Sequence, residues 1–346
     1  MQAAILLAPS NFVVSEIPDP ECPSGGVVIQ VKVCGICSSD VKMVTKGHRA
    51  LMYPRVLGHE IVGIVVESQS SHFTIGDRVQ VAPGLCCKLC RECQRGMDNQ
   101  CFSREIFGFS RDGGFAEYLP VPLDGAVVGT LTKLPENVSF ALAALAEPLA
   151  CCLNAQEKIG VREGDVVLII GAGPLGLLHA GVARSLGAST ILFSEIDVRR
   201  RQQLVPRWAD LVIDPVKEDL ASVVMDITAG QGVDVLLLAA GSNCNLDKNF
   251  LNFIRRGGRV SVFSGLSTEY SQIEVDLNLL HYKEIFLSGA YGCAVCHNRA
   301  AITFLADAGQ YFTELISHRF SLLETVIGIE MVKNKEVFKA IVEVER

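Results

Sequence analysis

Thiol, imidazole and carboxyl side chains gather at two places in the N-terminal third of the chain. Cys37 ends an apolar run, and His59 and Glu60 follow Gly58. A thiolate, an imidazole and a carboxylate that converge from two loops would suit a zinc ion that keeps one position open for a substrate. These residue types also occur as ordinary packed or surface groups, so their identity alone does not decide between the two interpretations.

Four cysteines form the second group, in a turn-rich segment at positions 84–103. They are separated by two, two and seven intervening residues: Cys87, Cys90, Cys93 and Cys101. Four thiolates on a short loop suit a tetrahedral zinc with every position filled, which leaves no place for a substrate. We therefore predict a structural zinc lobe here. Cys86 is adjacent, but the spacing favours Cys87 as the ligand.

Composition bounds the possible partners of the chain. Its 346 residues are enough for two domains, and 31 basic against 38 acidic residues give a net charge of −7. No basic surface is implied, so we expect neither nucleic acid nor a membrane as partner, but a small molecule. Without a leader-like pattern, the thirteen cysteines favour a reducing, cytoplasmic location.

A glycine-rich turn predicts a dinucleotide site. It lies between the apolar run Val166 to Ile170 and a helical run, and it reads Gly171, Ala172, Gly173, Pro174, Leu175, Gly176. In such a GxGxxG turn the first glycine permits the tight bend, the second admits a pyrophosphate, and the third lets helix and strand pack closely. Pro174 suits the first helical position, and the helix N–H groups would face the phosphates.

An acidic residue at the end of the next predicted strand favours NAD over NADP. Glu195 lies 24 residues beyond Gly171, where a carboxylate would accept hydrogen bonds from the ribose hydroxyls and repel a 2′-phosphate. Arg199, Arg200 and Arg201 follow closely and could instead hold a phosphate. We expect NAD, with Arg200 as a candidate ribose contact.

The elements that must position these residues fall into two patterns. The first 140 or so residues contain short strands between Gly and Pro turns, namely Val27 to Val33, Ile61 to Glu67 and Arg78 to Ala82. Six buried apolar strands then alternate with helices: Val166 to Ile170, Thr190 to Ser194, Leu211 to Ile213, Val233 to Ala239, Arg259 to Ser264 and Ile285 to Ser288. The predicted class is α/β, a doubly wound parallel sheet plus a β domain that a strand at Val337 to Val344 could complete.

The ordered motifs resemble those of the zinc-containing medium-chain dehydrogenases, over essentially the whole chain. They are GICSSD (35–40), GHE (58–60), GDRV (76–79), the four-cysteine lobe, EPL (147–149) and GAGPLG (171–176). The resemblance implies a GroES-like domain at 1–140 and 290–346 and a Rossmann domain at 141–289, with the active site in the cleft where they meet. It also implies a homodimer or homotetramer, with pairing of Rossmann edge strands near Ile285 to Ser288.

The resemblance assigns a ligand set to the catalytic zinc. Cys37 and His59 match ligands of that zinc, and Glu60 and Glu147 match the remaining positions near it; which glutamate ligates stays open. A glutamate at 147, where alcohol dehydrogenases proper have cysteine, resembles the sorbitol, threonine and polyol dehydrogenase branch. Asp40 matches the carboxylate that orients His59.

The resemblance also implies a route for the substrate proton. Ser39 matches the hydroxyl that passes the proton onward, and Lys339 matches a basic residue that touches the pyrophosphate. Relatives commonly carry a histidine three residues after the relay hydroxyl, where this chain has Lys42. Lys42 or His48 could replace it, and an exposed lysine without a role is the simpler interpretation.

The implied activity is hydride transfer between a secondary alcohol and NAD, with one catalytic and one structural zinc in each chain. The glutamate-rich zinc site favours a polyol, cyclitol, sugar or amino alcohol. A biosynthetic ketone or aldehyde reductase that uses NADH or NADPH is the alternative within enzymes. A catalytically silent protein that binds zinc and NAD is the alternative outside them.

One further pattern lies near the C-terminal third of the chain. Cys293, Cys296 and His297 form a short CxxCH sequence, which can indicate haem attachment or a metal site. No other feature supports a haem, so we predict that these residues pack at the start of a helix.

Overall fold

The computed structural model describes residues 1–122, 129–203, 207–241, 244 and 246–345. These residues form two compact units, Met1–Ala150 with Cys293–Arg346, and Cys151–Gly292. The sequence placed the domain boundaries after residues 140 and 289; the compact units divide after Ala150 and after Gly292. The first division falls inside a helix, α5 (Ala146–Ile159).

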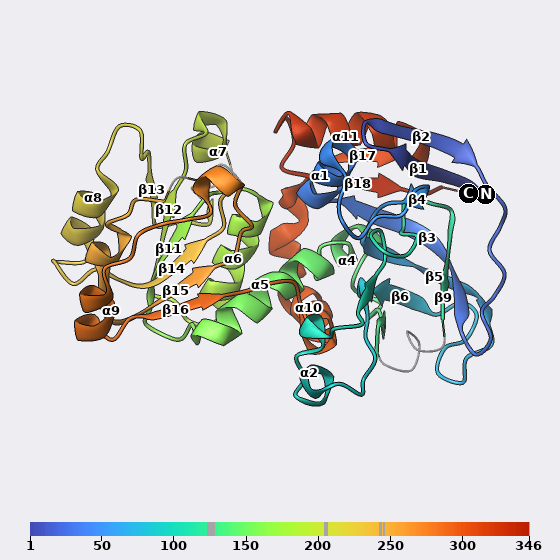
Figure 1. Cartoon of the computed structure of the whole chain (residues 1–346), viewed down its shortest axis with the longest axis horizontal. Coiled ribbons are helices and arrows are strands. Elements are labelled where there is room, and N and C mark those ends of the chain that lie inside the picture. The colour runs from blue at the N-terminus through green and yellow to red at the C-terminus, as the bar shows by residue number, and fades with distance from the viewer. Residues whose placement is uncertain (123–128, 204–206, 242–243, 245, 346) are drawn as a thin grey trace. The chain divides into compact units, whose positions relative to one another are not determined.

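The first unit is built around β-sheets (Figure 1). Among the described residues its largest sheet has seven strands in the order β10-β6-β5-β3-β18-β17, with β9 also paired to β3. These strands are β3 (Val27–Ile36), β5 (Glu60–Ser68), β6 (Arg78–Val81), β9 (Tyr118–Val121), β10 (Leu131–Lys133), β17 (Ile316–Ser321) and β18 (Lys339–Glu343). Two smaller sheets contain β1 (Gln2–Ala8), β2 (Asn11–Glu16) and β4 (Arg55–Val56), and β7 (Gly84–Leu85) and β8 (Glu105–Ile106).

Helices connect the strands of this unit. They are α1 (Ser38–Lys46), α2 (Arg91–Gln94), α4 (Phe140–Ala143), the start of α5, α10 (Val295–Ala308) and α11 (Thr325–Lys333). Short 3₁₀ segments lie at η1 (Asp98–Gln100), η5 (Gly309–Leu315) and η6 (Leu322–Glu324). The C-terminal segment therefore returns to the first unit, as the sequence predicted, and there β18 pairs with β3.

The strand register of this sheet brings three chain segments to one point. β3 pairs with β5 so that Gly35 faces Glu60, and β18 pairs with β3 so that Ala340 faces Ile36. Cys37 leaves the end of β3, and His59 enters β5 beside it. Side chains 20 or more residues apart in sequence therefore share one end of the sheet.

The second unit is a parallel sheet with helices between its strands. In the described part of the chain it has six strands, in the order β13-β12-β11-β14-β15-β16, as Figure 1 shows. The strands are β11 (Val166–Ile170), β12 (Thr190–Ser194), β13 (Leu211–Ile213), β14 (Val233–Leu238), β15 (Ile254–Val262) and β16 (Phe286–Gly289). Every residue of β14 is buried, as expected for a parallel strand covered on both faces.

The remaining elements of the second unit alternate with these strands. They are the rest of α5, then α6 (Pro174–Ser185), α7 (Val198–Gln203), α8 (Leu220–Ile227), η3 (Phe250–Phe253), η4 (Thr268–Tyr270) and α9 (Leu277–Lys283). The apolar run Val166 to Ala183 divides into β11, the glycine-rich turn and α6, as predicted. Among the described residues, none of the helices combines the length and apolar character that a membrane span requires.

Candidate metal and cofactor sites

Cys37, His59 and Glu60 come together in the first unit. One ligand atom from each, the Cys37 sulfur, a His59 ring nitrogen and a Glu60 carboxylate oxygen, lies within 4.8 Å of the other two. Cys37 precedes helix α1 in an extended conformation (φ −105°, ψ 154°), and Glu60 is the first residue of β5. Two loops thus deliver three side chains of the kind that zinc prefers.

His59 is held from both sides of its ring. Its Nδ1 lies 3.4 Å from Oδ1 of the fully buried Asp40, and its Nε2 lies 3.4 Å from the Ser39 hydroxyl oxygen. The other Asp40 oxygen accepts a hydrogen bond from the Cys37 backbone N–H at 2.9 Å. Burial alone would lower the pKa of His59, but the Asp40 carboxylate and the Cys37 sulfur raise it well above its usual range. Asp40 therefore lies where a carboxylate that orients a metal-binding imidazole should lie.

Glu60 is buried against a cation and beside a glycine. The Lys339 ammonium forms an ion pair with Glu60 and donates to the Ile36 carbonyl oxygen at 3.1 Å. Burial alone would lower the pKa of Lys339, but the Glu60 carboxylate, the Cys37 sulfur and the Glu147 carboxylate together raise it. A Cβ atom on Gly35 would meet the Glu60 carboxylate at 1.8 Å, so only glycine at this position leaves room for it.

The residues present fit a zinc ion. Glu60 Oε1 is buried and has no hydrogen-bond partner among the residues that the structure describes. A buried polar atom without a partner costs about 1–3 kcal/mol when it is neutral, and more when it is charged. A bound cation would interact with this oxygen and remove that cost. A soft thiolate, an imidazole and a carboxylate also match the donor types of catalytic zinc sites.

Glu147 lies outside the group formed by Cys37, His59 and Glu60. It is the second residue of α5 and is half-buried. One of its carboxylate oxygens lies within 4.8 Å of the Cys293 sulfur, whereas the group of close ligand atoms around Cys37 includes Glu60 and not Glu147. Among the described residues the structure therefore brings Glu60, rather than Glu147, into contact range of Cys37 and His59.

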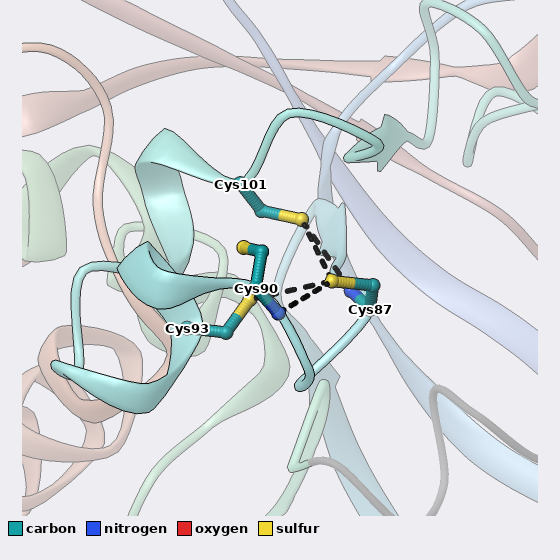
Figure 2. A group of neighbouring side chains, drawn as sticks. All are labelled: Cys87, Cys90, Cys93 and Cys101. Atoms are coloured by element: carbon teal, nitrogen blue, oxygen red, sulfur yellow. Dashed lines mark hydrogen bonds between the residues drawn. The ribbon is translucent and has the colours of Figure 1, made fainter.

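The four predicted lobe cysteines converge on one point, as Figure 2 shows. Their sulfur atoms lie within 4.8 Å of one another; the Cys87 sulfur is 3.6 Å from that of Cys101 and 4.0 Å from that of Cys93. Zn–S bonds of about 2.3 Å place the sulfurs of a tetrahedral site about 3.8 Å apart. The two measured separations fall on either side of that value, so the lobe fits a closed four-thiolate zinc.

Backbone groups favour the thiolate form of Cys87. The Cys90 backbone N–H donates to the Cys87 sulfur at 3.3 Å. This bond, with one from Leu89, lowers the pKa of the Cys87 thiol to about 6, whereas burial and the neighbouring thiols raise the pKa of Cys93. Thiolates rather than thiols bind zinc, so Cys87 is the lobe cysteine whose surroundings most favour metal binding.

The glycine-rich turn has the geometry of a dinucleotide-binding turn. Gly171 has a φ of 98°, a conformation that side chains disfavour, and a Cβ on Gly176 would lie 2.0 Å from the Gly171 carbonyl oxygen. Gly173 precedes α6, Pro174 takes its first position and Leu175 follows. The first backbone N–H groups of α6 lack intrahelical partners and suit phosphate oxygens.

Glu195 and Arg200 border this turn. Glu195 Oε2 accepts from the Ala172 N–H at 2.7 Å, and its Oε1 accepts from the Asp197 N–H at 2.8 Å. Arg200 lies 3.8 Å from the same Glu195 oxygen, and it is the neighbour that a Cβ on Gly173 would meet. The predicted ribose-binding carboxylate is thus fixed beside the turn, with one arginine next to it.

The two candidates for the onward proton route differ in their surroundings. Lys42 is exposed on α1. His48 contacts the Phe109 ring edge-on at 5.4 Å, and His59 contacts the same ring at the same centroid distance. Partial burial lowers the pKa of His48. A role for either residue in proton transfer stays a prediction.

Comparison with known proteins decides the family. Residues 23–134 match the family model described as alcohol dehydrogenase GroES-like domain, and residues 174–307 match the one described as zinc-binding dehydrogenase. An uncharacterized zinc-type alcohol dehydrogenase-like protein of Haemophilus influenzae is 35% identical over 293 residues, which cover 84% of this chain and 83% of that protein. The chain belongs to the zinc-type alcohol dehydrogenase family.

Two further relatives support the assignment of this chain to the zinc-type alcohol dehydrogenase family. L-threonine 3-dehydrogenase of Yersinia enterocolitica is 29% identical over 343 residues, 98% of each chain. The crystal structure of a protein described as a zinc-binding dehydrogenase from Sinorhizobium meliloti, bound to NADP, matches with a TM-score of 0.90 and 28% identity, over 99% of this chain and 98% of that one. The predicted medium-chain family, the GroES-like and Rossmann-type fold class and an oxidoreductase acting on a small molecule are confirmed.

Some contacts within these sites were not predicted from the sequence. Gly35 lies in a recognised motif, but its close approach to Glu60 follows only from the strand register. The ion pair of Lys339 with Glu60 joins the last strand, β18, to β5, and the proximity of Cys293 to Glu147 joins the segment before α10 to α5. Contact of Lys339 with a pyrophosphate stays a prediction.

Proposed function

We propose that this zinc-type alcohol dehydrogenase transfers a hydride between a secondary alcohol and NAD, with one catalytic and one structural zinc in each chain. The observation that carries the proposal is the meeting of Cys37, His59 and Glu60 next to the Ser39 hydroxyl. This arrangement pairs a metal-binding set with a group that can accept and pass on a proton. A catalytically silent scaffold would have no need for it.

A bound zinc supplies Lewis acidity, which makes a substrate hydroxyl easier to deprotonate. The residues of the chain then have separate tasks. Ser39 is placed to take the substrate proton and pass it on, and Asp40 fixes the His59 ring so that its Nε2 faces the Ser39 hydroxyl. Lys339 balances the charge of Glu60 in a buried setting. A dinucleotide held at the turn of Gly171, Gly173 and Gly176 would supply the hydride acceptor.

The proposed substrate class is a polyol, cyclitol, sugar or amino alcohol. Support comes from Glu147 at the position where alcohol dehydrogenases proper have cysteine, and from a relative that is a threonine dehydrogenase. The test is the rate of NADH formation with one member of each class and with simple primary alcohols. A kcat/KM at least tenfold higher for one polyhydroxy or amino-alcohol class supports the proposal. A preference for simple primary alcohols contradicts it.

We expect Glu195→Ala to weaken the preference for NAD over NADP by about 10- to 100-fold. A charge-assisted hydrogen bond of about 1.5–3 kcal/mol would be lost with NAD, and repulsion of a 2′-phosphate would be lost with NADP. The measurement is the ratio of kcat/KM with the two cofactors. Glu195→Gln is the matched control, because it retains an acceptor for the Ala172 N–H without the charge. An unchanged ratio in both variants rules out the ribose assignment.

We expect Glu60 to be the carboxylate that completes the catalytic zinc set. Glu60→Gln should weaken zinc binding at this site by about 100-fold or more, since loss of a ligand should exceed the roughly 10- to 100-fold effect of an outer-shell change. Glu147→Gln should change it by less than about tenfold. Zinc is counted after dialysis against graded chelator. Greater zinc loss from the Glu147 variant than from the Glu60 variant would reverse the assignment.

The oligomeric state and the location stay predictions. A homodimer or homotetramer formed through the sheet edge is supported by β16, the outermost strand on its side, whose Phe286 and Leu287 are 51% and 40% exposed. A cytoplasmic location rests on the sequence alone.

A further inference from the structure

Helix α10 is capped by a residue of the zinc lobe. Ala294 at the N-cap has no polar side chain, and the local acceptor, His297 Nδ1, takes the N–H of Ala294 at 3.0 Å rather than that of Val295. Asp98, 197 residues earlier, supplies one: its Oδ1 accepts from the Val295 backbone N–H at 3.0 Å in a buried setting. A negative charge at this position also interacts favourably with the helix dipole.

Asp98 is fixed by the loop that carries the four thiols. It opens the short segment η1, and its carbonyl oxygen accepts from the N–H of Cys101, a lobe ligand, at 3.1 Å. Its second carboxylate oxygen lies 3.1 Å from the Lys88 ammonium, and Lys88 follows the ligand Cys87 directly. The path of this loop, and so the place of the Asp98 carboxylate, depends on the four cysteines staying together.

On the α10 side of the contact between Asp98 and Val295, the chain lies close to Glu147. Cys293, two residues before α10, accepts a hydrogen bond from Asn298 Nδ2 at 3.1 Å. The Asn298 side-chain oxygen in turn accepts from the Gln80 amide of β6 at 3.3 Å. The Cys293 sulfur lies within 4.8 Å of a Glu147 carboxylate oxygen. The segment that leads into α10 therefore lies beside Glu147, which the sequence predicted near the catalytic zinc and which the structure places outside the Cys37, His59 and Glu60 group.

The seam between lobe and helix is closely packed. It encloses a cavity of only ≈ 10 Å³, lined on the lobe side by Cys86, Asp98 and Arg104 and on the other side by Cys293, Val295 and Asn298. That volume is at most about enough for one water molecule. A closely packed interior transmits displacement, so a shift of the lobe cannot be absorbed locally.

We propose that Asp98 is a positioning residue through which metal in the four-cysteine lobe holds the first turn of α10, and with it Cys293, against Glu147. The lobe then acts on the catalytic site as well as on stability. The part that concerns turnover rests on the proposed function; the coupling between lobe and helix does not.

The test compares the zinc-loaded protein with its Asp98→Ala and Asp98→Asn variants and with Glu92→Ala, which removes a carboxylate elsewhere in the same lobe, on α2. The readouts are amide hydrogen exchange over residues 293–300, the alkylation rate of Cys293 by iodoacetamide, zinc content, and kcat and KM. The Asp98→Ala protein should keep both zinc ions. Its amides at the start of α10 should exchange about tenfold faster, and iodoacetamide should alkylate its Cys293 faster. Its kcat should fall about tenfold, and Asp98→Asn should recover part of each effect.

A second variant removes the lobe metal itself. Cys101→Ser should speed exchange at the α10 start as Asp98→Ala does, and the double variant should add little, because both act through one contact. Unchanged exchange and alkylation in Asp98→Ala, or equal changes in Glu92→Ala, would overturn the coupling. Faster exchange with an unaltered kcat would overturn the positioning role. Absence of turnover in the parent protein would instead count against the proposed function, while exchange and alkylation would still judge the coupling.

Discussion

Cys37→Ser is expected to lower kcat/KM by at least about 1,000-fold while the fold and the lobe zinc persist. The Cys37 sulfur is one of three ligand atoms that lie within 4.8 Å of one another, and a serine hydroxyl is a poor replacement for a thiolate. Loss of the several kcal/mol that a Lewis acid contributes corresponds to about this factor. The measurement is the steady-state rate with the best alcohol, together with zinc per chain.

The matched control for this change is Cys296→Ser. Cys296 is an exposed cysteine on α10, outside the Cys37 cluster, so the same atom replacement should leave the rate within about twofold of the parent. The melting temperatures of both variants should stay within a few degrees of the parent. Parental turnover in Cys37→Ser would remove Cys37 from the mechanism.

Cys90→Ser is expected to release the lobe zinc and to destabilise the first unit. Three thiolates cannot fill the tetrahedral site, and the zinc-binding free energy that supports the loop would be lost in large part. If that loss is about 3–5 kcal/mol, the melting temperature should fall by about 4–7 °C for a chain of this size. Zinc content should drop by one ion per chain.

Cys86→Ser provides the comparison, because Cys86 adjoins Cys87 but lies outside the group of four close sulfurs. It is buried, so a small loss of stability is expected, but both zinc ions should remain. Equal zinc loss from the two variants would mean that Cys86 is a ligand and that the spacing was read one residue out of place.

The parallel sheet was the part of the fold that the sequence predicted best. The strands Val166–Ile170, Thr190–Ser194 and Leu211–Ile213 have the predicted bounds, because each is a buried apolar run between turn residues. β15 begins at Ile254, five residues before the predicted start, where the polar run Arg255 to Gly258 gave no strand signal. Pairing of Val233 with Ile254 extends the strand there, a long-range contact that local pattern does not encode.

In the candidate sites, too, features within one short segment could be predicted from the sequence, whereas contacts between distant segments could not. Spacing alone predicted the four-cysteine lobe, because its ligands lie on one short loop. The Glu60 to Lys339 ion pair depends on the pairing of β18 with β3 and of β3 with β5, which sequence periodicity does not specify. The Asp98 contact with Val295 spans 197 residues and leaves no local signal at either end.

The proposed zinc-dependent hydride transfer is tested most directly by measuring zinc per chain and alcohol-dependent NADH formation on one preparation, before and after removal and return of zinc. We expect two zinc ions per chain and NADH formation with a polyhydroxy or amino alcohol. That activity should be lost when the more weakly held zinc is removed and recovered when zinc is returned. A single zinc per chain with no NADH from any alcohol class, or undiminished activity without zinc, would contradict it.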